Sequence, residues 1–257
     1  AVYGFDVVNE AIAPDGSLLP LSPWAVVPDY LHKAFVIARD ELDQMGRGDV
    51  TLFYNDFEIE YGQSRYYELF VAAPGCYNKS EAVYGVIQQL VERGTPIDGV
   101  GFQTHLVVTG DPLETCEQRT NALLHNTGRM VATMRRFGAL GLEVRVTEID
   151  VARRGDALSN AALAEVQSAY FGGAMMACLA TRGICTGYTV WGTHDDASWY
   201  ANRPGFPAPN PLLYEAVASR VYDPARDKCI PTPRRITTEW YCPKSGYEAI
   251  RAALEWG

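Results

Sequence analysis

The 257-residue sequence lacks several features that would assign it to a function class at once. No apolar run approaches the roughly 18 residues that a transmembrane helix needs. No stripe of Lys and Arg is present, and the net charge of −9 makes a nucleic-acid partner a poor interpretation. No Gly-rich phosphate loop follows the first apolar segment, which disfavours a doubly wound nucleotide-binding fold. The acidic composition suits a neutral substrate at least as well as a charged one.

The six cysteines lack the CxxC spacing of zinc and redox sites, so we expect no metal ligands. An even number of scattered cysteines fits disulfides formed in an oxidising compartment. Fifteen connectivities are possible. Cys178 and Cys185 bracket a short turn and Cys229 and Cys242 bracket a loop, so we expect these two pairs, which leaves Cys76 with Cys116. The sequon "NKS" at Asn78 is a glycosylation candidate and favours the same compartment. We therefore expect a secreted, extracellular protein.

Short apolar segments alternate with helical patterns along the chain. The segments rich in β-branched and aromatic residues predict five buried strands, at 3–10, 50–57, 98–106, 142–151 and 185–195. The helical patterns predict helices at about 31–42, 83–91, 115–138, 160–181 and 245–257. Gly94 is expected to follow the end of the second helix.

This alternation predicts parallel βαβ units. Polar residues at the end of every strand are typical of a (β/α)8 TIM barrel. With five strands rather than eight, we expect the chain to supply the last five βα units of such a barrel, strands 4 to 8.

Two carboxylates follow β-branched runs and should project from strand ends: Glu10 and Glu148. Two carboxyl groups facing one cleft are the minimum needed to cleave a glycosidic bond. Asp150 lies two residues after Glu148 and shares its strand face, and His105 is well placed to bridge the two. His105 and Gln103 would keep Glu148 ionised. Glu10, beside a neutral amide and apolar neighbours, is expected to have a raised pKa.

A simpler interpretation is that both glutamates are solvated loop residues. For either residue alone, that interpretation is favoured. For Glu10 and Glu148 together, with Gln103, His105 and Asp150 at neighbouring strand ends, it is disfavoured.

The sequence blocks at the strand ends resemble a known family. "DVVNEAI", "LFYNDFEIE", "PIDGVGFQTHL", "VRVTEIDV" and "TVWGTHDDASW" are similar to five successive signature blocks of glycoside hydrolase family 10, the endo-β-1,4-xylanases. The tail "PKSGYEAIRAAL" is similar as well. The resemblance implies a single catalytic domain over residues 1–257 that lacks the family's N-terminal βα units.

The resemblance also implies the catalytic roles. Glu10 would be the acid/base and Glu148 the nucleophile of a retaining double displacement. Asn9 would hydrogen-bond the 2-hydroxyl of the sugar that is cleaved. No metal or other cofactor is expected, and the partner would be xylan or xylo-oligosaccharides.

The resemblance also implies roles for residues that surround the two carboxylates. Gln103 and His105 would hold the nucleophile, with Asp150 orienting His105. Trp191 and Trp199 would form a wall against the sugar faces. For Trp191, the alternative is a core position at the base of the last strand.

Phe57 occupies the place of an aromatic residue that stacks on the leaving-group side in the family. Asn55 and Asp56 are expected to brace neighbouring loops. The other histidines are expected on the surface: His32, His125 and His194. Two departures from the family pattern are Phe5, where a Trp is usual, and Asp196, where a Lys is common.

The family's first three βα units have no counterpart in the chain. We expect that the chain is part of a longer protein, that a second chain completes the barrel, or that the fragment rearranges. The leading functional hypothesis is a retaining endo-β-1,4-xylanase. The alternative is a non-catalytic or weakly active carbohydrate-binding or structural protein on a truncated xylanase scaffold, and a third interpretation changes the polymer to another β-glycan.

Overall fold

The computed structural model describes residues 2–13, 15–20, 22–61, 64–65, 76–77, 79–109, 123–154, 159–204, 206, 210–217, 220–223, 228–231 and 240–256. The chain forms two compact units. The first unit comprises Ala1–Thr104, Cys116–Thr147 and Ala177–Tyr188. The second unit comprises His105–Thr115, Glu148–Met176 and Thr189–Gly257. None of the described helices is both long and apolar enough to cross a membrane.

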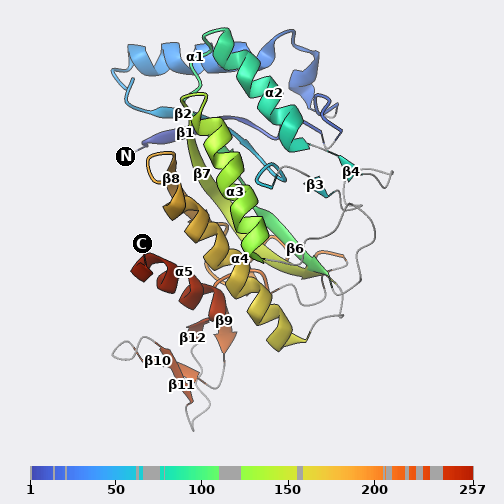
Figure 1. Ribbon diagram of the computed structural model, residues 1–257, viewed down its shortest axis with the longest axis vertical. Coiled ribbons are helices and arrows are strands. Elements are labelled where there is room, and N and C mark those ends of the chain that lie inside the picture. The colour runs from blue at the N-terminus through green and yellow to red at the C-terminus, as the bar shows by residue number, and fades with distance from the viewer. Residues whose placement is uncertain are drawn as a thin grey trace. The chain divides into compact units, whose positions relative to one another are not determined.

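Parallel strands form the centre of the first unit (Figure 1). Strand β1 (Gly4–Asn9) pairs with β2 (Thr51–Asp56), which pairs with β5 (Gly99–Phe102). Strand β5 pairs in turn with β7 (Glu143–Arg154), a long strand that continues into the second unit and also pairs with β8 (Cys185–Val190). The pairing is parallel because a helical connection returns the chain to the same end of the sheet before most of these strands begin.

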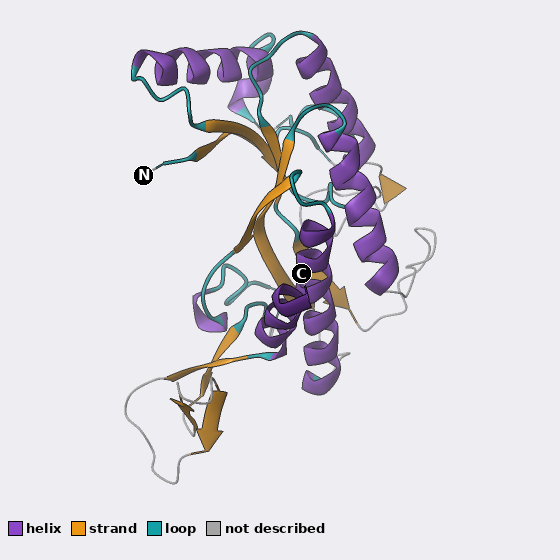
Figure 2. Cartoon of the chain, turned by 60° about the vertical axis from the view of Figure 1, so that its left-hand side comes forward, coloured by secondary structure: helices purple, strands orange, loops and turns teal. Residues whose placement is uncertain are grey.

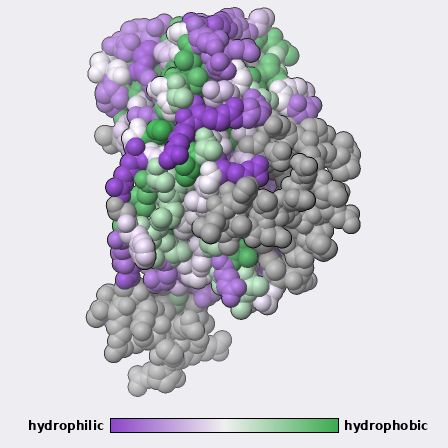
Figure 3. All heavy atoms as spheres, viewed as in Figure 1, coloured by the Kyte–Doolittle hydropathy of each residue, from purple (hydrophilic) through white to green (hydrophobic). Residues whose placement is uncertain are grey.

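Three helices belong to the first unit: α1 (Tyr30–Gln44), α2 (Lys79–Glu92) and α3 (Leu123–Gly138). In Figure 2 one helix of this unit lies across the top of its strands and the other two run along their right-hand side. Their apolar faces and the strands bury a core that includes Phe35, Leu52, Tyr54, Val83, Ile87, Val100, Phe102, Met130 and Phe137. Figure 3 shows hydrophilic residues gathered over the region of α1 and α2, as expected for the solvent faces of amphipathic helices.

The end of α2 shows how the sequence sets a helix boundary. Gly94 has a φ of 70°, the left-handed conformation that glycine adopts without steric cost. The backbone N–H of Thr95 donates to the carbonyl of Leu90 at 3.0 Å, and that of Gly94 to Val91 at 2.9 Å. These bonds satisfy carbonyls that the helix leaves open. The predicted role of Gly94 is confirmed.

The second unit contains β6 (His105–Thr109), which runs parallel to the C-terminal part of β7 and places His105 opposite Asp150. A small core forms around Ala152, Tyr200 and Phe206. Helix α4 (Asn160–Ala180) begins in this unit, and α5 (Ser245–Trp256) lies within it. The shorter elements of the chain are η1 (Pro23–Val26), β3 (Ser64–Arg65), β4 (Cys76–Tyr77), η2 (Asp195–Ala197), β9 (Tyr214–Val217), β10 (Arg220–Asp223), β11 (Lys228–Pro231) and β12 (Trp240–Pro243).

Strand β1 is an edge strand, since among the described strands it pairs with β2 alone. Two exposed aromatic residues lie at the beginning of β1: Tyr3, directly before the strand, is 74% exposed, and Phe5, its second residue, is 51% exposed. An unpaired strand edge with exposed apolar side chains is a surface with which a further strand can pair.

A strand or helix is present in each of the five predicted strand segments and five predicted helix segments, but the details differ in several places. The prediction of one strand over 98–106 is wrong, because β5 ends at Phe102 and β6 begins at His105. Between them Thr104 has a φ of 62°, which breaks the extended backbone. The segment 115–122 of the third predicted helix lies outside the described residues. The antiparallel pairs β9–β12 and β10–β11 were not predicted.

Candidate active site

Glu10 occupies a turn directly after β1. Its φ is 55°, a left-handed conformation that is uncommon for a residue with a side chain. The backbone N–H of Glu10 donates to the carbonyl of Asn55 at 2.9 Å, so the neighbouring strand holds this turn in place. Backbone conformations of this kind cluster at functional sites, where the surrounding structure compensates for their cost.

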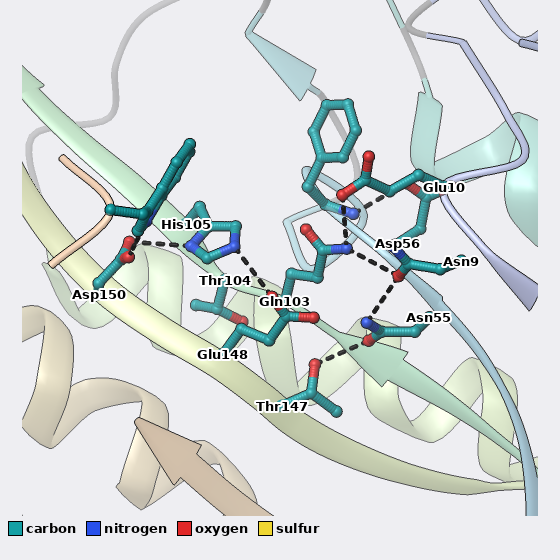
Figure 4. Close-up of polar contacts among 12 residues, drawn as sticks. Asn9, Glu10, Asn55, Asp56, Gln103, Thr104, His105, Thr147, Glu148 and Asp150 are labelled. Carbon is teal, nitrogen blue, oxygen red and sulfur yellow. Dashed lines mark hydrogen bonds and ion pairs between the residues drawn. The ribbon is translucent and has the colours of Figure 1, made fainter. Parts of the chain in front are cut away.

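The Glu10 carboxylate belongs to a polar network at the ends of β1 and β5 (Figure 4). Gln103 Nε2 donates to Glu10 Oε1 at 3.0 Å and to Asn9 Oδ1 at 3.1 Å. The side chain of Gln103 is buried, and its Oε1 has no hydrogen-bond partner among the described residues. Gln103 was expected to hold Glu148; its described hydrogen bonds are instead to Asn9 and Glu10.

Phe57 is half-buried and follows β2. The Nζ of Lys79 lies 3.2 Å from the centre of the Phe57 ring and 2.6 Å from Asp56 Oδ1. Asp56 also accepts a hydrogen bond from the hydroxyl of Tyr54 at 2.5 Å. Asp56, which was expected to brace neighbouring loops, thus contacts the first residue of α2 and a residue of its own strand. Lys79 was not predicted, since nothing in its local sequence indicates that a lysine 23 residues away is the partner of Asp56.

The second unit contains the other predicted carboxylate in a separate cluster. His105 Nε2 lies 3.2 Å from Glu148 Oε2, and His105 Nδ1 lies 3.0 Å from Asp150 Oδ1. The bridge that the two-residue spacing of Glu148 and Asp150 predicted is therefore present. Asp150 is fully buried and Glu148 is 8% exposed. The indole N–H of Trp199 donates to Asp150 Oδ2 at 2.7 Å and completes the cluster.

Electrostatics keep His105 charged in this cluster. Burial alone would lower the pKa of His105, but its hydrogen bonds to Asp150 and Glu148 outweigh burial and raise that pKa to about 9. Burial raises the pKa of Asp150, against the lowering effect of the His105 and Trp199 hydrogen bonds. At neutral pH an imidazolium thus lies directly beside the Glu148 carboxyl group.

The two tryptophans expected to contact sugar have exposed rings. Trp191 is 46% exposed and Trp199 is 41% exposed. Their ring centres lie 6.3 Å and 5.1 Å from that of His105. The alternative of a core position for Trp191 is wrong, since nearly half of this residue is accessible. Arg203 stacks on the Trp199 ring at 4.3 Å and holds its orientation.

The loop after Trp191 is fixed by an ion pair. Lys244 Nζ lies 3.0 Å from Asp195 Oδ2, and it also donates to the carbonyl of Asn210 at 2.7 Å. The backbone N–H of Leu212 donates to Asp195 Oδ1 at 2.8 Å. Asp195 therefore connects the loop after β8 with the segment before α5.

The histidines expected on the surface are less exposed than predicted. His194 is half-buried and stacks on Tyr241 with ring centres 4.0 Å apart. His32 is half-buried and its Nδ1 lies 2.8 Å from Thr95 Oγ1. Surface positions were predicted for His32 and His194 because their partners, Thr95 and Tyr241, are distant in the sequence and cannot be inferred from the neighbouring residues. The side chain of His125 lies outside the described residues.

Comparison with known proteins identifies the family. The sequence model of glycosyl hydrolase family 10 matches residues 1–222. The chain belongs to glycosyl hydrolase family 10. An endo-1,4-beta-xylanase 1 from Humicola insolens is 33% identical over 199 residues, which cover 77% of this chain and 38% of that protein. The exoglucanase XynX of Acetivibrio thermocellus is 29% identical over 218 residues, which cover 84% of this chain and 16% of that protein.

The fold of the chain is also similar to that of a solved family 10 structure. The crystal structure of a xylanase of this family from Bispora sp. MEY-1 with xylobiose has a TM-score of 0.70 and 27% identity. The match covers 98% of this chain and 62% of that one. The family 10 chain therefore spans less than two thirds of the length of each of these proteins. The predicted fold class, part of a (β/α)8 barrel, is confirmed.

One of the three predicted disulfides is described. Cys178 and Cys185 are bonded, with Cα atoms 5.1 Å apart. Cys242 is also disulfide-bonded, and the side chain of its expected partner Cys229 lies outside the described residues. The side chains of Cys76 and Cys116, and the sequon residue Asn78, lie outside them as well. Among the described side chains, no group of three or more His, Cys, Asp or Glu residues could hold a metal ion.

Proposed function

We propose that this chain is the catalytic part of a retaining endo-β-1,4-xylanase, with Glu10 as the acid/base and Glu148 as the nucleophile. The observation that carries the proposal is the contact of Glu148 with His105 at 3.2 Å, with Asp150 behind the imidazole at 3.0 Å. A carboxylate supported by a positively charged donor is suited to attack an anomeric carbon. Membership of family 10 supports the same assignment.

In the first step, Glu148 attacks the anomeric carbon while Glu10 gives its proton to the glycosidic oxygen. The carbon–oxygen bond to the leaving sugar breaks, and a glycosyl ester forms on Glu148. In the second step, Glu10 takes a proton from water, the water oxygen attacks the same carbon, and Glu148 leaves as a carboxylate. Two inversions at one carbon give net retention.

The neighbouring side chains support this chemistry. Asn9 is exposed beside Glu10 and is proposed to hydrogen-bond the sugar 2-hydroxyl. The buried Oε1 of Gln103 has no partner among the described residues, so a hydroxyl donor from a ligand would be stabilised there. The exposed rings of Trp191 and Trp199 offer apolar faces to the C–H faces of a pyranose. Phe57, which lies over Lys79, is proposed to stack on the leaving-group side.

The proposed substrate is xylan or xylo-oligosaccharide. Solved relatives contain xylobiose and xylotriose, which supports this choice. One relative is named an exoglucanase, so a glucan is the alternative substrate polymer. We also propose secretion, for which the Cys178–Cys185 bond is the supporting feature.

The exposed edge of β1 supports a proposal about assembly. Tyr3 and Phe5 are accessible there, and β1 has one strand partner among the described strands. We propose that further strands, from a preceding segment of the natural protein or from a second chain, pair with this edge and complete the barrel. A second candidate function, a carbohydrate-binding or structural protein on a truncated scaffold, is favoured by the same edge.

The test is hydrolysis of xylohexaose by the full-length natural protein and by the 257-residue chain, followed by proton NMR of the first product. Retention predicts that the β-anomer appears first, and Glu148→Ala should abolish release of sugar while the protein remains folded. Initial α-anomer would overturn the mechanism. Binding of xylan without hydrolysis by the full-length protein would favour the second candidate.

A further inference from the structure

A chain of hydrogen bonds links three strands of the first unit beside Glu10 (Figure 4). Thr147 Oγ1 donates to Asn55 Oδ1 at 2.7 Å, and Asn55 Nδ2 donates to Asn9 Oδ1 at 2.9 Å. Thr147 belongs to β7, Asn55 to β2, and Asn9 is the last residue of β1. Asn55 is buried, so both ends of its amide are fixed in a site that excludes water.

Strand β5 lies between β2 and β7, and a side chain on β5 would separate Asn55 from Thr147. The residue that pairs with Asn55 is Gly101. A Cβ atom at this position would lie 2.3 Å from Asn55 Oδ1 and 2.9 Å from Thr147 Cγ2. Both distances are shorter than a Cβ atom tolerates from a neighbouring oxygen or carbon atom. The missing side chain at Gly101 therefore allows Asn55 and Thr147 to meet across the intervening strand.

In each of these hydrogen bonds the donor and the acceptor are fixed, and this determines whether the oxygen or the nitrogen of the Asn9 amide faces the solvent. Both hydrogen bonds from described residues to the Asn9 side chain are received by Oδ1, from Asn55 Nδ2 at 2.9 Å and Gln103 Nε2 at 3.1 Å. Gln103 Nε2 also donates to Glu10 Oε1, and because a carboxylate accepts hydrogen bonds, this contact fixes the orientation of the Gln103 amide. Asn9 is exposed, so its Nδ2 remains available as a donor.

We propose that Thr147 and Asn55 are positioning residues that lock the Asn9 amide with Nδ2 toward the substrate, and that Gly101 is required for the lock. The inference rests on the proposed function, because it names the substrate group that benefits, the 2-hydroxyl of the sugar that is cleaved. Without the lock, the hydrogen bond from Gln103 alone orients the Asn9 amide, so the fraction of molecules in which this amide is rotated by half a turn rises. Thr147 acts through Asn55 and does not touch the sugar.

The direct test of the lock needs no turnover. In the 15N-labelled chain, the side-chain amide signals of Asn9 and Asn55 are followed in Thr147→Val, which keeps the shape but removes the hydroxyl. The signals should shift, and their hydrogen exchange should accelerate about three- to tenfold, the weight of one neutral hydrogen bond. Thr147→Ser, which retains the hydroxyl, should keep the wild-type signals.

A matched control is Thr133→Val. Thr133 is a buried threonine of α3 whose hydroxyl donates to the carbonyl of Arg129 at 3.0 Å, outside the network. The Thr133→Val variant should leave the side-chain amide signals of Asn9 and Asn55 unchanged. Gly101→Ala should reproduce the Thr147→Val effect; if that variant does not fold, Thr147→Val alone decides. Unchanged Asn9 and Asn55 signals in Thr147→Val would overturn the proposal.

The second readout connects the lock to the substrate in the full-length natural protein. Thr147→Val should lower kcat/KM for an aryl β-xylobioside about three- to tenfold. For the matching 2-deoxy substrate, which lacks the hydroxyl that Asn9 would bind, the change should be less than about twofold. Equal losses on both substrates would overturn the link to the 2-hydroxyl. A wild-type protein without turnover would contradict the proposed function, while the amide signals would still decide the lock.

Discussion

Lys79 and Asp56 form an ion pair in which both side chains are completely buried, with Nζ 2.6 Å from Oδ1. Removing one partner of such a pair leaves the other charge buried without compensation. Lys79→Met should therefore lower the free energy of unfolding by about 3–5 kcal/mol, measured by urea denaturation. The double variant Lys79→Met/Asp56→Asn should lose less than the sum of the two single variants.

The control for this prediction is the exposed pair of Arg93 and Asp29, whose side chains are 49% and 41% accessible. Arg93→Met should cause only a small fraction of the Lys79→Met loss, because solvent screens an exposed pair. Equal losses at the two sites would contradict a stabilising role for the buried pair.

The raised pKa of His105 predicts a pH dependence of stability. Its folded-state value of about 9 lies above the ordinary 6.5, so the folded protein binds this proton more tightly than the unfolded chain. The stabilisation is fully present below about pH 6.5 and is lost as the pH rises through about 9. The difference in unfolding free energy between wild type and His105→Gln should shrink over this range.

The titration itself is measured by NMR of the His105 ring. Asp150→Asn should move the midpoint downward, because it removes the hydrogen bond that most raises the pKa of His105. A His105 midpoint near the ordinary value of 6.5 in the wild type would contradict the charged imidazolium.

The ion pair of Lys244 and Asp195 predicts an effect on substrate binding. Since Asp195 belongs to the loop that follows Trp191, Lys244→Met should raise the KM for xylo-oligosaccharides severalfold with a smaller change in kcat. Lys33→Met is a suitable control, because Lys33 is exposed on α1 and donates only to the carbonyl of Pro28 among the described contacts. Kinetics with an unchanged KM for Lys244→Met would show that the pair does not position this loop.

The Cys178–Cys185 bond closes a short loop with a sequence separation of 7 residues. Replacing both cysteines by serine should lower the free energy of unfolding by about 2–3 kcal/mol, as expected for a loop of this size. Thermal denaturation of the oxidised protein, the reduced protein and the double variant measures the effect. A double variant as stable as the oxidised wild type would show that the bond adds nothing to the fold.

Much of the fold could be predicted because the deciding signals are local. The strand that becomes β2 contains the apolar and aromatic run Leu52–Tyr54, and the end of α2 is set by Gly94. The bridge of His105 between Glu148 and Asp150 could be predicted because two residues on one strand face have a fixed geometry.

Other features depend on contacts that no local pattern encodes. The break at Thr104 requires a positive φ that the sequence does not favour. The partner of Asp56 is 23 residues away, and the importance of Gly101 is apparent only once Asn55 and Thr147 lie on either side of it. Gln103, which was expected to hold Glu148, donates to Asn9 and Glu10, two residues more than 90 positions away in the sequence.

The most direct test of the central claim is covalent trapping. The full-length natural protein is treated with a 2-deoxy-2-fluoro-β-xylobioside that carries a good leaving group, and the labelled peptide is sequenced by mass spectrometry. The account predicts one sugar adduct on Glu148, which Glu148→Ala abolishes. An adduct on any other residue would contradict the assignment, as would rapid turnover of normal xylobiosides with no trapped adduct.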